Sequence, residues 1–231
     1  MLHKEEAAQI LSAKGWLSQL PSDFRENVIR SCVLRNFAKG DSIYREGDPP
    51  GGMYGVAAGS VGVFAIHRRD GPYVSHLGQP GFWFGTGATS GESRRDTITA
   101  RCETAVLYLS ARAMNEIVES NPSNWRFFTL NVVLNLRTAM RANDDLLVRD
   151  PFIRVASILL RISGCEAHLG TASNPIEIEI TQSELAQLCG LSRVSVSRML
   201  GRLEDTGFID ASYGRVSLLK PMSLSKLAAA S

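Results

Sequence analysis

Arginines and small polar side chains share one face of a short helix that we expect near the C-terminus. Thr181 and Glu184 have the spacing of a capping box, which begins a first helix. Gly190 suits a tight left-handed turn, and Ser192 caps a second helix that ends at Gly207. Two short helices joined by a glycine turn are the helix-turn-helix layout, whose second helix enters the DNA major groove.

The two faces of the second helix differ in chemistry. At about 100° per residue, its apolar side chains fall on one side and belong to the core: Val196, Met199, Leu200 and Leu203. The other side fits a major groove, where arginine can bond guanine in a bidentate manner. The predicted DNA-binding residues are Arg193, Val194, Ser195, Ser197, Arg198 and Arg202. The alternative is a solvated helix whose arginines bind nothing.

Other reactive groups form no pattern that could support catalysis or metal binding. The four cysteines include no C-x-x-C pair, which fits a reducing cytosol and predicts neither a disulfide framework nor a zinc knuckle. The sequence contains no G-x-S-x-G, H-E-x-x-H or P-loop motif. We therefore expect a protein that is not an enzyme and holds no metal.

Composition excludes several classes of protein. The chain has 231 residues, 44% of them hydrophobic and 21% charged, which is typical of one or two globular domains. No apolar run approaches the roughly 18 residues of a membrane span, and the N-terminus lacks the apolar segment of a signal peptide. We expect a cytoplasmic protein. Its net charge is only +2, so any signal for nucleic-acid binding has to be local.

A long helix is expected between Asn121 and Arg149, with Pro122 at its first position. Its apolar stripe recurs at steps of three and four residues, which favours burial against two partners. One interpretation is a single long core helix. The other, which we favour, is a two-fold dimer seam in which Asn135 and Asn143 set the register. The predicted seam residues are Phe128, Val132, Leu136, Ala139 and Leu146.

Residues 1–120 read as a short helical lead, beginning at Pro21–Asp23, followed by many short strands. Turn glycines punctuate the strands and predict an antiparallel β-roll: Gly40, Gly47, Gly59, Gly71 and Gly81. Asp150 and Pro151 begin a third segment, which ends in a two-stranded wing over 208–218. The expected fold is α+β, with a β-roll (1–120), a long helix (121–149) and a winged helix-turn-helix domain (150–231).

These segments resemble the family of the cyclic-AMP receptor protein and the fumarate–nitrate-reduction regulator, the Crp–Fnr family. The matching motifs are Lys39–Asp48, Met53–Val56 with Gly59–Val61, Gly81–Gly85 and Ser192–Arg198. The resemblance implies a cyclic-nucleotide-binding-like roll, also called a double-stranded β-helix. It further implies a homodimeric transcription regulator that binds a palindromic operator and contacts RNA polymerase. The alternative function is a ligand-binding module whose winged helix serves protein contacts only.

The effector site departs from the family pattern. The family places a ribose-binding Glu soon after the last glycine turn of the roll, whereas here Gly85 is followed by Thr86 and Gly87. Arg94 aligns best with the phosphate-binding Arg, with Arg95 as the second choice, and either can instead pair with Asp96. The predicted effector residues are Gly85, Thr86, Arg94, Arg95 and Thr97.

The identity of the effector stays open. Cyclic AMP is not expected because the ribose-binding carboxylate is missing. An iron–sulfur cluster is not expected because the first 31 residues contain no cysteine, and haem on His76 is not expected because strand histidines are commonly ordinary side chains. The remaining alternatives are another anionic or small organic effector, or no effector. Whether the protein activates or represses does not follow from the sequence.

Overall fold

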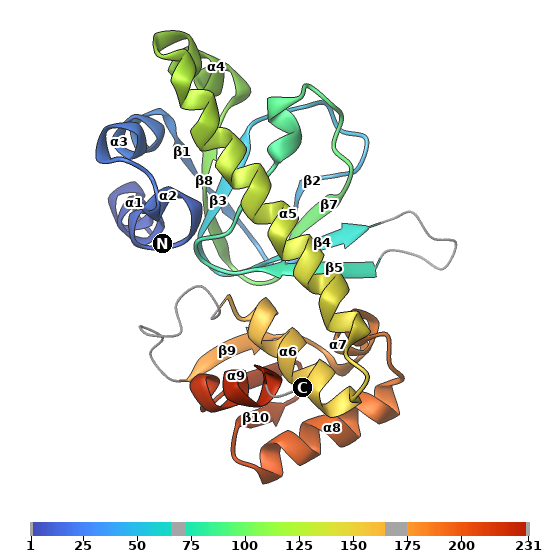
Figure 1. Cartoon of the computed structure of the whole chain (residues 1–231). Coiled ribbons are helices and arrows are strands. Elements are labelled where there is room, and N and C mark those ends of the chain that lie inside the picture. The colour runs from blue at the N-terminus through green and yellow to red at the C-terminus, as the bar shows by residue number, and fades with distance from the viewer. Residues whose placement is uncertain (1, 66–72, 165–174, 230–231) are drawn as a thin grey trace. The chain divides into compact units, whose positions relative to one another are not determined.

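A computed structural model describes residues 2–65, 73–164 and 175–229 of the chain (Figure 1). The chain divides into two compact units. The first comprises Met1–Pro72 and Leu77–Arg137, and the second comprises Tyr73–His76 and Thr138–Ser231. The division falls within the long helix, and each unit is described by itself. The turn predicted at Gly71 lies outside the described residues.

The helical lead of the first unit is divided into three pieces. The third of these begins directly after Pro21, as predicted, and buries Phe24 and Val28. A further helix, which sequence reasoning missed, is capped by the Ser110 hydroxyl, which accepts a hydrogen bond from the Ala113 amide. The helices are α1 (Lys4–Ala13), α2 (Gly15–Ser18), α3 (Ser22–Ser31) and α4 (Ala111–Ser120), followed by the 3-10 turn Pro122–Asn124 and α5 (Trp125–Leu147).

The expected β-roll is present as two four-stranded sheets in the described part of the chain. One sheet has the order β1-β8-β3-β6, with β1 at Val33–Phe37, β8 at Thr104–Leu109, β3 at Met53–Ala58 and β6 at Trp83–Phe84. The other has the order β2-β7-β4-β5, with β2 at Ser42–Tyr44, β7 at Thr97–Ala100, β4 at Val61–Ala65 and β5 at Tyr73–Gly78. The sequence predicts strands over 42–44, 53–56, 61–66, 73–77 and 105–110, which correspond to β2, β3, β4, β5 and β8, whereas β1, β6 and β7 were missed.

Two apolar cores stabilise the first unit. One lies between the helices and a sheet and contains Trp16, Trp83 and Phe128. The other lies inside the roll and contains Tyr44, Tyr54, Phe84 and their neighbours. These clusters hold β6 from both sides, because Trp83 belongs to the first core and Phe84 to the second.

Phe128 corrects the predicted seam. Its side chain is fully buried, with its ring centroid 5.9 Å from that of Trp16 and 5.4 Å from that of Phe24. The indole of Trp16 also donates a 2.7 Å hydrogen bond to the carbonyl of Phe127. The predicted spacing of three and four residues does describe the apolar side chains of this helix. Phe128, however, points into its own unit and is not available to a second chain.

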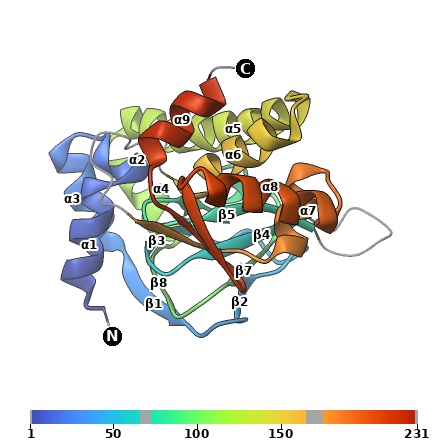
Figure 2. The ribbon, with the colours of Figure 1, turned by 90° about the horizontal axis from the view of Figure 1, so that it is seen from below.

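The second unit holds the end of α5, four further helices and a three-stranded sheet of order β10-β11-β9 among the described residues. The helices are α6 (Pro151–Ile162), α7 (Gln182–Cys189), α8 (Arg193–Asp205) and α9 (Pro221–Ala229), and the strands are β9 (Ile176–Glu179), β10 (Ile209–Ser212) and β11 (Arg215–Leu218). Figure 2 shows the orange helices α7 and α8 side by side. Within the described residues, no helix has both the length and the apolarity needed to cross a membrane.

We expect Phe128→Ala to lower the free energy of unfolding by about 3–5 kcal/mol, because it opens a cavity among aromatic rings. Urea unfolding followed by circular dichroism measures this change. Glu119→Ala, at an exposed position on α4, serves as the control and should change stability by less than about 0.5 kcal/mol. A loss of less than about 1 kcal/mol in Phe128→Ala would contradict the placement of this ring in the core.

Candidate nucleic-acid interface and ligand site

The helix-turn-helix is built from local hydrogen bonds that the sequence predicts. The Thr181 amide donates to Glu184 Oε2 at 2.9 Å, and the Glu184 amide donates back to Thr181 Oγ1 at 3.2 Å. Gly190 ends α7 in the left-handed conformation, with φ +60°, which a side chain would disfavour. The Ser192 hydroxyl then accepts from the Ser195 amide at 3.1 Å and begins α8. The predicted layout is confirmed.

The two faces of α8 separate as expected. Its buried side chains are Val196, Met199, Leu200 and Leu203. Its first two turns expose Arg193, Val194, Ser197 and Arg198. Val194 is 72% exposed, although valine gains free energy on burial. This outward face presents two guanidinium groups with small side chains between them, which suits the edges of bases in a major groove.

Two other predicted DNA-binding residues, Ser195 and Arg202, make contacts within the second unit. The Ser195 hydroxyl lies 3.0 Å from the Ser192 hydroxyl, within the cap of α8. The Arg202 guanidinium lies over the ring of Phe152, 4.2 Å from its centroid, and its Nη1 is 3.8 Å from the sulfur of Met199. Arg202 therefore stabilises the packing of α8 on α6.

The wing projects an aromatic residue that sequence reasoning did not single out. Tyr213 lies at the turn between β10 and β11 and is fully exposed. The Ile180 amide donates to the Gly214 carbonyl at 3.0 Å, which ties this turn to the start of α7. Nearby, Arg215 and Glu177 form a solvated ion pair at 3.2 Å, which contributes little stability. The exposure of Tyr213 cannot be read from a hairpin pattern.

The predicted effector residues do not converge on one point. Arg94 is buried, whereas Arg95 is exposed and pairs with Glu92 at 3.0 Å. The Thr97 hydroxyl accepts a hydrogen bond from the Glu46 amide at 3.1 Å, and the Thr86 carbonyl accepts one from Thr89. Only Gly85 lies in hydrogen-bonding contact with Arg94.

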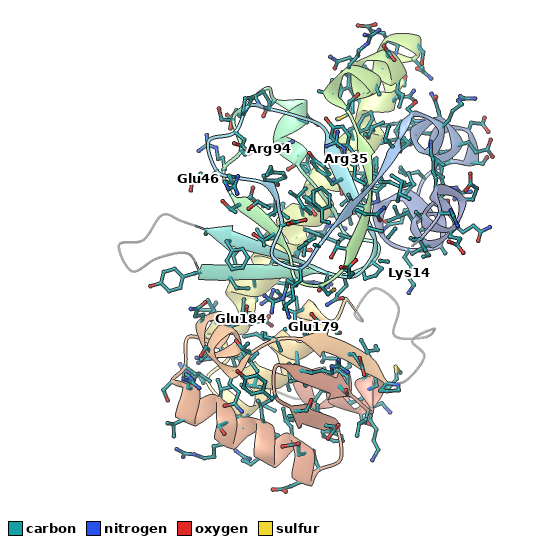
Figure 3. All side chains as sticks on the ribbon, turned by 180° about the vertical axis from the view of Figure 1, so that it is seen from behind. Lys14, Arg35, Glu46, Arg94, Glu179 and Glu184 are labelled. Carbon is teal, nitrogen blue, oxygen red and sulfur yellow. The ribbon has the colours of Figure 1, made fainter. Side chains whose placement is uncertain are left out.

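Figure 3 labels Arg94, which lies in the roll. Its guanidinium is hydrogen-bonded to the protein's own backbone. Its Nη1 donates to the Gly85 carbonyl at 3.1 Å, and its Nη2 donates to the Gly52 carbonyl at 2.7 Å. The guanidinium also lies over the ring of Tyr44, 4.3 Å from the centroid. An anion that binds Arg94 therefore has to share the guanidinium with two backbone carbonyls.

A partly buried acid, Asp96, lies beside this arginine. Burial raises the pKa of the Asp96 carboxyl, and its hydrogen bond with the Tyr44 side chain and the charge of Arg94 partly oppose that rise. Burial likewise raises the pKa of the Tyr44 hydroxyl, and Asp96 raises it further. Arg94 and Asp96 therefore interact electrostatically within the roll. In the described ranges, no group of three or more histidine, cysteine or acidic side chains is arranged to hold a metal ion.

Comparisons with known proteins agree with both the roll and the helix-turn-helix. Residues 34–121 match the family model of the cyclic nucleotide-binding domain, and residues 153–227 match that of the Crp-like helix-turn-helix domain. A similar curated protein is the cAMP-activated global transcriptional regulator CRP of Pasteurella multocida, 25% identical over 78% of this chain and 87% of its own length. Another is the transcriptional activator protein anr of Pseudomonas aeruginosa, 23% identical over 84% of this chain and 80% of its own.

Solved structures extend the likeness to the fold. A Crp/Fnr-family transcriptional regulator from Thermus thermophilus is 26% identical, with a TM-score of 0.64, over 85% of this chain and 98% of its own. FixK2 from Bradyrhizobium japonicum is 23% identical, with a TM-score of 0.73, over 87% of this chain and 98% of its own, and it supports the fold alone. With its roll, its helix-turn-helix and these relatives, the chain belongs to the Crp–Fnr family of DNA-binding transcription regulators.

Proposed function

We propose that the protein is a homodimer that binds a palindromic operator and responds to a signal in the roll other than cyclic AMP. One observation carries the proposal: α5 leaves a continuous apolar stripe uncovered. The exposed members of this stripe are Val132 (38%), Leu136 (58%), Met140 (59%), Leu146 (45%) and Leu147 (72%).

Such a stripe needs a partner. Apolar side chains spaced three and four residues apart lie on one side of a helix, and a large exposed apolar patch is costly in water. A second copy of α5 would offer the same stripe and bury both in a two-fold seam. Ala139 is exposed beside the stripe and Asn143 is an exposed polar residue on the same helix, which keeps both as seam candidates. Asn135 instead donates to the Trp83 carbonyl of its own chain.

A two-fold dimer presents two copies of α8. Each copy would offer Arg193, Val194, Ser197 and Arg198 to one half-site, and the symmetry of the dimer predicts half-sites about one helical turn apart. As a member of its family, the protein would act on chromosomal DNA in the cytoplasm and contact RNA polymerase. The alternative, a winged helix that contacts only proteins, predicts no DNA affinity that falls steeply with salt.

The proposed signal is an effector other than cyclic AMP, for two reasons. No acidic residue follows Gly85 where the family binds ribose, since the next residues are Thr86 and Gly87. In addition, two donors of Arg94 are already used by the carbonyls of Gly85 and Gly52. Sharing the guanidinium with those carbonyls would reduce the gain from a cyclic phosphate.

We expect Leu136→Glu combined with Met140→Glu to convert the dimer into monomers. The change would bury four unpaired carboxylates in an apolar seam, at a cost of several kcal/mol. Sedimentation velocity measures the oligomeric state. Arg141→Glu, at an exposed position at least about 100° round the same helix from both replaced residues, is the control and should remain dimeric. A double variant that sediments as an unweakened dimer would remove α5 from the seam.

We expect Val194→Glu to change the preferred base at one symmetric step of the operator. Valine can pack only on a thymine methyl, whereas glutamate accepts a hydrogen bond from cytosine, a difference of about 1–3 kcal/mol. Arg198→Ala should lose preference for guanine. Arg202→Ala is the control, because this side chain lies over Phe152 and should leave the selected sequence unchanged. Selection from a random DNA library compares these variants, and identical half-sites for the parent and Val194→Glu would show that Val194 reads no base.

We expect cyclic AMP to bind no tighter than about 0.1 mM, which corresponds to a weak free energy of binding near −5.5 kcal/mol. Isothermal titration calorimetry on the purified protein measures this affinity. A micromolar site in the parent protein that disappears in Arg94→Ala would contradict the proposal, because it would mean that Arg94 releases its carbonyls at little cost.

A further inference from the structure

Strand β6 connects the interior of the roll with the long helix. Trp83 packs on Trp16, with ring centroids 5.1 Å apart, in the core that also contains Phe128 of α5. The next residue, Phe84, stacks on Tyr54 at 5.3 Å inside the roll. Because side chains alternate along a strand, these two residues bring two separate cores to opposite faces of one short segment.

Two side chains from distant parts of the sequence hold the backbone of this segment. Asn135 of α5 donates through Nδ2 to the Trp83 carbonyl at 3.0 Å. Arg94 donates through Nη1 to the Gly85 carbonyl at 3.1 Å. A bond from a charged donor contributes more than one from a neutral amide, so the Arg94 bond is the stronger restraint.

The segment has little room to move independently of its ends. Gly55 lies opposite Trp83 in the sheet, and a Cβ built on Gly55 would collide with the Trp83 ring. Gly85 has φ +89°, and a Cβ there would lie 2.7 Å from the Gly52 carbonyl oxygen. Packed interiors transmit displacements rather than absorb them. A shift of Gly85 is therefore passed to Trp83.

In its observed position, α5 also leaves buried hydrogen-bond donors without acceptors, which costs free energy. In the described part of the chain, Trp83 Nε1 and Asn131 Nδ2 are buried donors with no hydrogen-bond acceptor. Asn131 is one helical turn from Asn135, on the face of α5 that is buried. An unmatched buried donor costs about 1–3 kcal/mol, so the observed position of α5 is not fully satisfied.

We propose that residues Trp83–Gly85 relay the state of Arg94 to α5, with Asn135 as the positioning residue that receives it. The proposal rests on the proposed function, in which an effector binds in the roll. An effector with a carboxylate or phosphate would draw the guanidinium from the carbonyls of Gly85 and Gly52. The freed segment would then shift, and the bond between Trp83 and Asn135 would carry the shift into α5.

A double-mutant cycle tests the relay without knowledge of the effector. Arg94→Ala reproduces the loss of the guanidinium, and Asn135→Ala removes the receiving bond. We expect each change alone to alter the dissociation constant for a selected operator duplex by at least about fivefold, as measured by fluorescence anisotropy. The double variant should differ from either single variant by less than twofold. Arg95→Ala and Asn115→Ala, which replace exposed residues of the same types, should remain within twofold of the parent.

Hydrogen exchange supplies a readout that needs no DNA. In Arg94→Ala, and equally in the milder Arg94→Lys, amides of α5 near Asn135 should exchange at least about tenfold faster than in the parent. Arg95→Ala should leave them unchanged. Multiplying effects in the double variant, or unchanged exchange on α5, would overturn the relay. A protein that binds no DNA would contradict the proposed function, and the exchange data would still decide the relay.

Discussion

The helix α5 carries an inner face that the rest of the chain buries and an outer apolar stripe that it leaves exposed. The inner face inserts Phe128 and Asn131 into the first unit, where both are almost fully buried. The outer face leaves Leu136 and Met140 more than half exposed. Burial of apolar surface is the main favourable term in folding and association, so this imbalance favours a second copy. The proposed two-fold symmetry of the DNA site follows from the same helix.

The end of α5 is joined firmly to the helix-turn-helix within the second unit. Arg154 of α6 donates to the Val148 carbonyl, just beyond α5, and to the Cys189 carbonyl at the turn between α7 and α8. Arg161, further along α6, forms a buried 2.7 Å ion pair with Asp145 of α5. Losing one partner of such a pair would be costly. A rotation of the end of α5 would therefore carry the recognition helix with it.

Features set by neighbouring residues could be predicted from the sequence. The capping box at Thr181, the turn at Gly190 and the start of α6 after Asp150, whose carboxylate accepts from the Phe152 amide at 2.8 Å, depend on contacts a few residues apart. Features that depend on distant contacts could not be predicted. Arg94 donates a hydrogen bond to the carbonyl of Gly52, and the guanidinium of Arg202 lies over the ring of Phe152. Periodicity located the stripe of α5 but not the aromatic cluster that covers Phe128.

The central claim is tested most directly in two steps. The protein first enriches a DNA duplex from a random pool, and native mass spectrometry then measures the complex that it forms with that duplex. The proposed two-fold dimer predicts two chains on one duplex, with a symmetric sequence in that duplex. The complex should dissociate as salt rises, because phosphate contacts release counterions. A single chain bound per duplex, or a pool in which no palindrome is enriched, would contradict the claim.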